Sequence, residues 1–154
     1  MKLKVVIIDY MDTNQKGDIT ELEVLTYMTK LNYQISIPFG DKDRYDQIWD
    51  INGHLLRIQV KTSRFSQQNG DCIIFKCMSA KVKLNGNVEY KQYTKDEIDY
   101  FATYWNDRCY LVPVEECGTE KRLRFDHPKN NQTKGINFAI DYEVETVLKR
   151  DGYT

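Results

Sequence analysis

The dipeptide Asn52-Gly53, within the segment RYDQIWDINGHLLRIQVKTSR, constrains the fold of this chain more than any other short feature. Both residues tolerate the positive φ angles of a type I′ turn, which joins two antiparallel strands through only two residues. The strand YDQIWDI enters this turn and HLLRIQVKTS leaves it. The sequence therefore predicts a tight β-hairpin, in which the pairing register decides which side chains share a face.

The second strand of this hairpin has an apolar face and a more polar one. Successive side chains point to opposite faces of a strand, so its residues fall into two sets. The first set is Leu56, Ile58 and Val60, and the second is Leu55, Arg57, Gln59 and Lys61. Asp46 begins the partner strand, so the turn can bring it near Gln59 and Lys61. Burying polar groups on a central strand costs free energy unless they have hydrogen-bond or ion-pair partners or serve a function.

The hairpin alone leaves two interpretations of this polar face open. An Asp46–Lys61 pair across a half-exposed sheet would need no function. The alternative is a functional site, and the helix that precedes the hairpin favours it.

A helix is predicted over residues 18–31, after the loop DTNQKG, in which Asn14 is a candidate N-cap. Glu21 lies on or beside the apolar face of this helix, whereas Glu23 is rotated away and is expected to be exposed. A carboxylate beside an apolar face is rare without a partner. If the helix packs on the hairpin, Glu21 can share a pocket with Asp46. The expected apolar face comprises Ile19, Leu22, Val24, Leu25, Met28 and Leu31.

Two carboxylates, an amide oxygen and a lysine that converge make an oxygen-rich site suited to Mg²⁺. Such a site can orient a water molecule and place a cation beside a scissile phosphate.

The rest of the chain is predicted to alternate strands with short helices. Strands are expected in NYQISIPF, DCIIFKCMS, NVEYKQY, YFATYW, RCYLVPV and KRLRF, with turns at NGN and NDR. Short helices are expected in KDEIDY, where Thr94 and Glu97 have capping-box spacing, in EECG and in the terminal AIDYEVETVLKR. A short strand or an ordered tail is expected over residues 2–9. This order predicts an α/β fold with a mixed central sheet flanked by helices.

Length and composition narrow the function classes. The 154 residues suffice for a single domain with a real core, and 41% hydrophobic with 29% charged residues is typical of a soluble protein. A net charge of −1 argues against indiscriminate nucleic-acid binding. Four cysteines without a CxxC pair, and only two histidines, match no zinc spacing, so we expect reduced and mostly buried thiols. No membrane-spanning segment or signal peptide is recognisable, and a cytoplasmic location is expected.

Three blocks together resemble the PD-(D/E)XK nuclease superfamily: KGDITE at residues 16–21, YD at 45–46 and QVK at 59–61. The helix and hairpin also resemble archaeal Holliday junction resolvases. SIPFGDKDRYD, LLRIQVKTSR, YTKDEIDYFA, YLVPVEE and KNNQTKGINFAIDYE are similar to blocks of the PD-(D/E)XK homing endonucleases encoded in bacterial group I introns. The resemblance covers residues 14–145. It implies one nuclease domain over residues 1–154, with a restriction-endonuclease-like core and residues 1–12 as an N-terminal extension.

The resemblance also implies roles for the site residues. Asp46 would be the metal-binding acid of the hairpin, and Glu21 the acid carried by the helix. Gln59 takes the place of a second strand acid, and Val60 would offer its backbone carbonyl to the metal. Lys61 would position the attacking water or stabilise negative charge in the transition state. The implied cofactor is Mg²⁺, with Mn²⁺ as a substitute.

The sequence departs from the superfamily pattern in two places. Tyr45 stands where the superfamily name has proline, and neutral Gln59 leaves the site one negative charge short. The intron-encoded group shares this glutamine, so an active enzyme is expected. A DNA-binding module that has lost cleavage is the alternative from another functional class.

Basic and amide side chains are candidates for contacts with double-stranded DNA. Those near the site or on the following strands, which can track phosphates, are Arg44, Arg57, Lys76, Lys81, Lys83 and Lys91. In the loop HPKNNQTKG, amides can read adenine edges between flanking lysines, and these residues are Lys129, Asn130, Asn131, Gln132 and Lys134. A solvated charged surface and an ordinary polar loop are the alternatives.

The expected function is a metal-dependent, site-specific DNA endonuclease of the homing type. A junction-resolving or repair nuclease is the alternative within the enzymes. Cutting both strands takes two active sites, and so small a domain reads only a short target, so a homodimer or homotetramer is expected.

Overall fold

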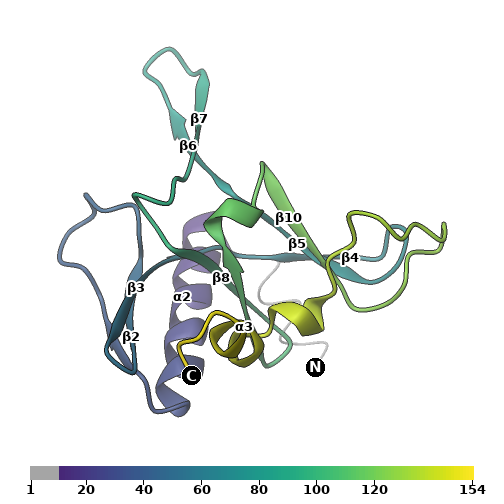
Figure 1. Cartoon of the computed structure of the whole chain (residues 1–154). Coiled ribbons are helices and arrows are strands. Elements are labelled where there is room, and N and C mark those ends of the chain that lie inside the picture. Colours follow the sequence, from purple (N-terminus) through teal and green to yellow (C-terminus); the bar gives the residue numbers. More distant parts are fainter. Residues whose placement is uncertain (1–10) are drawn as a thin grey trace.

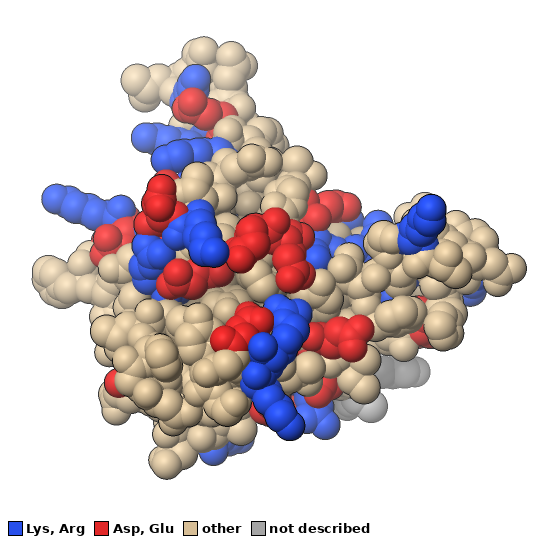
Figure 2. Space-filling model, in the orientation of Figure 1, with Lys and Arg blue, Asp and Glu red and all other residues tan. Residues whose placement is uncertain are grey.

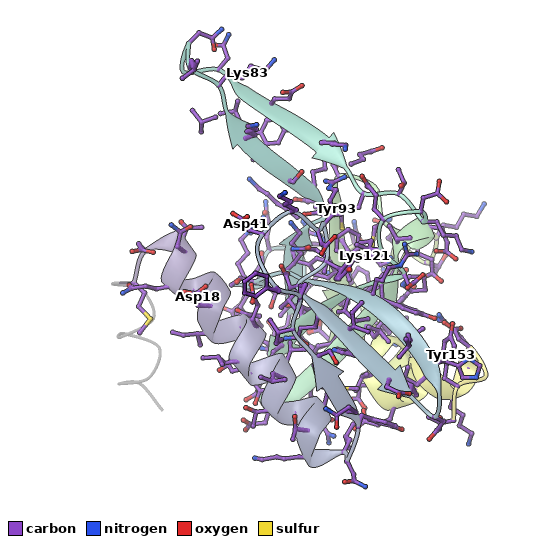
Figure 3. The ribbon with its side chains drawn as sticks, turned by 90° about the vertical axis from the view of Figure 1, so that its left-hand side faces the viewer. Asp18, Asp41, Lys83, Tyr93, Lys121 and Tyr153 are labelled. Atoms are coloured by element: carbon purple, nitrogen blue, oxygen red, sulfur yellow. The ribbon has the colours of Figure 1, made fainter. Side chains whose placement is uncertain are left out.

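The structure is a computed structural model that describes residues 11–154, and a five-stranded mixed sheet forms its centre. The strand order is β1-β2-β3-β8-β9, with β3 and β8 parallel and the other neighbours antiparallel. Helices α2 (Thr13–Lys30) and α3 (Val144–Arg150) lie on opposite sides of this sheet (Figure 1 and Figure 3). The prediction of a mixed sheet flanked by helices is confirmed. The strands are β1 (Gln34–Ser36), β2 (Gln47–Ile51), β3 (His54–Val60), β8 (Tyr100–Trp105) and β9 (Arg108–Pro113).

The hairpin of β2 and β3 forms around the predicted turn. Asn52 and Gly53 have φ angles of 54° and 90°, as a type I′ turn requires. Asp50 Oδ1 accepts a hydrogen bond from the Gly53 N–H at 2.7 Å. The register pairs Gln47 with Ile58, and the apolar positions of β3 share a buried face as predicted.

Buried polar contacts fasten α2 to this hairpin. The fully buried Gln47 donates from Nε2 to the Glu21 carbonyl at 2.9 Å and accepts from Trp49 Nε1 at 2.9 Å. Thr20 Oγ1 lies 2.9 Å from Thr62 Oγ1. A buried amide is tolerated when both its donor and its acceptor are satisfied, as they are here. These contacts fix the backbone of Glu21 against the hairpin.

The helix begins at a different cap from the one predicted. Asp12, and not Asn14, is the N-cap, because Asp12 and Gln15 each bond the other's backbone N–H in a capping box. The helix consequently begins at Thr13 rather than near residue 18.

The buried face of α2 is also rotated from the predicted one. Thr20, Val24 and Met28 are its buried residues, whereas Leu22, expected on the apolar face, is 60% exposed. Glu23, expected to be exposed, is half-buried and has an interaction partner. The hydroxyl of Thr20 takes a buried position because Thr62 satisfies it.

Two smaller sheets extend from the centre. β10 (Glu120–Arg124), β5 (Cys72–Lys76) and β4 (Arg64–Ser66) form a three-stranded sheet in that order. β6 (Met78–Val82) and β7 (Val88–Gln92) form a two-stranded ribbon that rises from the body, and we call residues 78–92 the arm (Figure 1). The turns η1 (Val114–Glu116) and η2 (Ala139–Tyr142) precede β10 and α3.

Two predicted helices take other forms. Residues 95–97 make only a turn, although the Thr94 N–H does donate to Glu97 Oε2 at 3.0 Å. The chain cannot continue as a helix there, because the Asp99 N–H bonds the Arg57 carbonyl at 2.9 Å and leads directly into β8. The terminal helix is divided into η2 and α3 at Glu143, whose ψ of 139° is extended. The strand or tail predicted over residues 2–9 lies outside the described residues.

The cysteines are mostly buried, as predicted. Cys72, Cys77 and Cys109 are buried, and Cys117 is partly exposed. Within residues 11–154, no helix is both long and apolar enough to cross a membrane.

Candidate active site

Asp46 lies at the open end of the hairpin, one residue before β2. Its N–H donates to the Ile58 carbonyl at 2.8 Å, and its Oδ2 accepts from the Val60 N–H at 2.9 Å. Burial raises the pKa of Asp46, whereas the bond from Val60 and the charge of Lys61 act to lower it. The main chain of β3 thus holds this carboxylate in place.

Glu21 reaches the same place from α2. Its backbone is fixed by Gln47, and its carboxylate is close enough to Asp46 for the two charges to interact. Burial first, then Asp46 and Asp18, raise the pKa of Glu21 to about 7. Asp18 lies near the N-terminal end of the same helix (Figure 3). The two acids that the sequence singled out are therefore neighbours.

Gln59 and Val60 bring neutral oxygens to the same strand end. Gln59 Nε2 donates to the Val60 carbonyl at 3.3 Å, so the amide lies beside the backbone oxygen that the resemblance implies as a ligand. The N–H of Val60 already binds Asp46. Residues 59 and 60 are thus held against the hairpin acid.

Lys61 is seated at the base of the arm. Its Nζ donates to the Met78 carbonyl at 3.2 Å, and it lies 3.4 Å from the Tyr93 hydroxyl and 4.9 Å from the centre of the Tyr93 ring. Burial lowers the pKa of Lys61, and nearby Asp46 acts to raise it. Contacts at the base of the arm therefore fix the position of the ammonium group, which remains close enough to Asp46 for the two charges to interact.

Arg44 also packs on the Tyr93 ring that Lys61 contacts. Its guanidinium carbon lies 3.8 Å from the Tyr93 ring centre, and it pairs with Glu97 at 2.6 Å. It also donates to Ser79 Oγ and to the Gln92 carbonyl, each at 2.8 Å. Its side chain is only 19% exposed, so little of it is left for a ligand. Sequence reasoning missed Tyr93, because only the fold brings residues 44, 61 and 93 together.

The other predicted phosphate contacts lie outside the cluster of acids. Arg57 pairs with Asp99 at 3.0 Å and also donates to the carbonyls of Lys95 and Asp96, so its contacts are structural. The lysines on or beside the arm are exposed, and two of them pair with acids, Lys83 with Glu89 at 3.6 Å and Lys91 with Glu97 at 3.3 Å. These exposed lysines are Lys76, Lys81, Lys83 and Lys91.

The amide-rich loop forms a second projection, between β10 and η2 on the right of Figure 1. Gln132 donates from Nε2 to the Lys134 carbonyl at 3.0 Å, and its N–H donates to Asn130 Oδ1 at 3.2 Å. Two of the amides thus help to shape the loop itself. Lys129, Asn130, Asn131, Gln132 and Lys134 are all exposed.

The donor set of the cluster fits a hard divalent cation. Glu21 and Asp46 offer carboxylate oxygens, and Gln59 and Val60 offer an amide and a carbonyl oxygen. Repulsion between the two acids is what a bound cation would relieve. No three His, Cys, Asp or Glu side chains gather as a metal-binding group anywhere in residues 11–154, so the neutral oxygens would have to complete the site.

Fold and cluster together define a class of protein, the nucleases that place paired acids and a lysine at the end of a β-hairpin in a mixed sheet. The chain belongs to the PD-(D/E)XK endonuclease family, whose model matches residues 11–145. The resemblance noted in the sequence is confirmed, and the protein is an endonuclease.

A solved structure gives the same answer for the fold. The bacterial homing endonuclease I-Ssp6803I is similar with a TM-score of 0.73, over 92% of this chain and 96% of that chain, at 22% sequence identity. The predicted restriction-endonuclease-like fold is thereby confirmed, and at this identity the likeness concerns the fold alone. The comparison with curated proteins found no match.

Proposed function

We propose that this endonuclease hydrolyses phosphodiester bonds of double-stranded DNA at a specific site, in the manner of a homing endonuclease, with Mg²⁺ as its cofactor and Mn²⁺ as a substitute. The electrostatic coupling of Glu21 to Asp46 carries the proposal, because two half-buried acids that repel each other are costly unless a cation neutralises them. Family membership supports the hydrolytic chemistry, and the fold shared with I-Ssp6803I supports the homing type.

Each residue of the cluster has a role in this proposal. Glu21, Asp46, the Gln59 amide and the Val60 carbonyl would hold the ion, which when bound supplies Lewis-acid activation of the scissile phosphate and the attacking water. Asp46 is kept in place by the Val60 N–H, so its position does not depend on a flexible side-chain contact. Lys61, held by the arm, orients the water or stabilises the negative charge that develops on the phosphate.

Recognition of DNA is assigned to the exposed projections. The exposed lysines of the arm and the amides of residues 130–132 are available to phosphates and base edges. Arg44 and Arg57 contribute little directly, because protein groups already occupy them. Two active sites are needed to cut both strands, so we also propose a homo-oligomer.

The experiment does not require the target sequence of the enzyme to be known in advance. Purified protein is incubated with a library of duplexes of random sequence and, separately, with a labelled four-way junction, in Mg²⁺, Mn²⁺ or chelator. The cut ends are then sequenced. We expect one consensus sequence from the duplex library, only when a divalent ion is present. Asp46→Asn, which can still accept the bond from Val60, should cut at least about a hundredfold more slowly.

Other outcomes discriminate among the alternatives. Preferential cutting of the junction would identify a junction-resolving nuclease. Binding to duplex without cutting in either ion would identify a module that has lost cleavage through Gln59. Cleavage by Asp46→Asn at the wild-type rate would refute the assignment of the site.

A further inference from the structure

The arm has two chemically different faces. Its register pairs Lys81 with Glu89 and Val82 with Val88, and neighbouring residues of a strand point to opposite sides. All charged side chains of the arm therefore share one face, consistent with the ion pair of Lys83 and Glu89. In Figure 2 the arm rises above the body, with its blue and red side chains beside a tan tip. The charged face comprises Lys81, Lys83, Glu89 and Lys91, and the opposite face comprises Met78, Ala80, Val82, Val88, Tyr90 and Gln92.

The uncharged face is open to solvent. Val82 is 69% exposed, Tyr90 57% and Val88 46%, and Leu84 at the tip is fully exposed. An antiparallel sheet of this pattern normally packs its apolar face on a core. Within the described chain, β6 and β7 pair only with each other, and a two-stranded ribbon alone is marginally stable in water. The face therefore has the character of a surface that a partner covers.

We propose that the apolar face of the arm is the contact surface for a second copy of this chain. The face carries no charged side chain, so two copies can meet face to face without burying a charge. A twofold contact requires such self-complementarity, because the same patch serves both subunits. DNA does not fit this face, since its phosphates would meet apolar groups, whereas the lysines of the opposite face remain available to it.

The size of the patch agrees with a contact of this kind. Its exposed apolar surface is on the order of 500 Å², the size of patch that marks interaction sites on soluble proteins. Two such patches would bury about 1,000 Å² in total, near the lower limit for a specific interface. Self-association is therefore expected to be weak in dilute protein and stronger on DNA, to which both basic faces are attracted.

The base of the arm connects this contact to catalysis. The Met78 carbonyl holds Lys61, and Arg44 ties Ser79 and the Gln92 carbonyl to the body. A contact between two arms would consequently fix the separation of two catalytic clusters, as a cut through both strands requires. Only this last step rests on the proposed function.

The test compares two variants that each place a new carboxylate on the full-length protein. Val82→Glu puts it on the apolar face, and Asn87→Glu puts it next to Lys83 on the charged side of the arm. Masses are measured by light scattering and sedimentation over a range of protein concentrations, with and without a duplex, and circular dichroism verifies the fold. In the absence of duplex, wild type and Asn87→Glu should associate alike, whereas Val82→Glu should associate at least about tenfold more weakly.

Cleavage gives a second readout. Val82→Glu should still nick one strand of a plasmid that carries the target but should lose most double-strand cutting. Asp46→Asn should have the same mass as wild type. If the wild-type protein fails to cleave DNA, that result contradicts the proposed function only. The measured masses alone then test the proposal about the arm. Monomeric wild type under all conditions, or unchanged association of Val82→Glu, would overturn the proposal. So would a loss of duplex binding in Val82→Glu without a change in mass, since the face would then contact DNA.

Discussion

At the scale of single residues, the pKa of Glu21 reflects its burial first and its repulsion by Asp46 second. Burial and the charge of Asp46 raise its pKa from 4.5 to about 7. Between these two pH values the folded chain retains a proton that the unfolded chain has lost. The contribution of Glu21 to the free energy of unfolding is therefore fully present below pH 4.5 and is lost as the pH rises through about 7.

Glu21→Gln should remove this dependence in metal-free protein. At about pH 8 the variant should resist urea better than wild type, and at about pH 4 the two should be alike, because a neutral amide replaces a carboxylate that repels Asp46. Urea unfolding in chelator across this range measures the effect. Thr26→Gln, at an exposed and uncharged position of the same helix, should keep the wild-type slope. If Glu21→Gln and wild type have the same slope, the pKa of Glu21 is not raised by its burial and by Asp46.

Gln59→Glu tests whether this side chain is a metal ligand. A third carboxylate should tighten Mg²⁺ binding in calorimetry, because it adds negative charge next to Asp46 and Glu21. Its repulsion should also lower the stability of the metal-free protein. We expect cleavage to change by less than about a hundredfold, roughly 3 kcal/mol in transition-state terms. Gln68→Glu, on an exposed loop, is the control, and equal Mg²⁺ affinity in the two variants would make the role of Gln59 structural.

At the scale of elements, Arg44 joins its own loop to the start of the arm and to the stretch that runs from the end of the arm into the following turn. It binds the turn at Glu97, the start of the arm at Ser79 and the end of the arm at Gln92, with most of its side chain buried. Arg44→Ala removes the donor of these bonds and leaves Glu97 with only Lys91 and the Thr94 N–H. We expect a loss of about 2 kcal/mol in the free energy of unfolding, as for charged hydrogen bonds that are partly buried.

The control for this prediction is an ion pair that is open to water. Lys95 pairs with Glu115 at 3.5 Å, and both side chains are largely exposed. Lys95→Ala should change the free energy of unfolding by no more than about 0.5 kcal/mol. If Arg44→Ala costs as little as Lys95→Ala in the same urea titration, Arg44 is not a structural clamp.

Local signals in the sequence sufficed for some elements and failed for others. Asn52-Gly53 fixed the hairpin, and the alternation after it gave the correct faces, because both are properties of neighbouring residues. The spacing of Asp12 and Gln15 is also a local signal, and it marks the N-cap that the structure shows in place of Asn14. No local signal could show that Asp99 pairs with Arg57, an interaction that leaves only a turn after Thr94 in place of the predicted helix. Nor could a local signal show that Arg44 and Lys61 both contact the Tyr93 ring. The proximity of Glu21 and Asp46 followed from helix phase, even though the phase of Leu22 was wrong.

At the scale of the whole molecule, charge is balanced, with a formal net charge of −1, so DNA binding has to come from local surfaces. Lys81→Gln and Lys83→Gln should each weaken duplex binding and lower the slope of log affinity against log salt by about one. Lys149→Gln, at an exposed position of α3, should leave the slope unchanged. Affinities measured at several salt concentrations decide the matter. Unchanged slopes for both arm variants would exclude the charged face of the arm as a phosphate contact.

The parallel pairing of β3 and β8 has a consequence for how such a protein can diversify. The Lys61 N–H bonds the Ala102 carbonyl, and the Asp99 N–H bonds the Arg57 carbonyl, so the chain leaves and re-enters the central sheet at adjacent points. Everything between these points, including the arm, is a single excursion that contains none of the four proposed ligand residues. Lineages can therefore lengthen, shorten or exchange the arm beyond Ser79 and Lys91 in steps of whole residue pairs. The catalytic framework would be inherited intact while the outer ribbon evolves at its own pace.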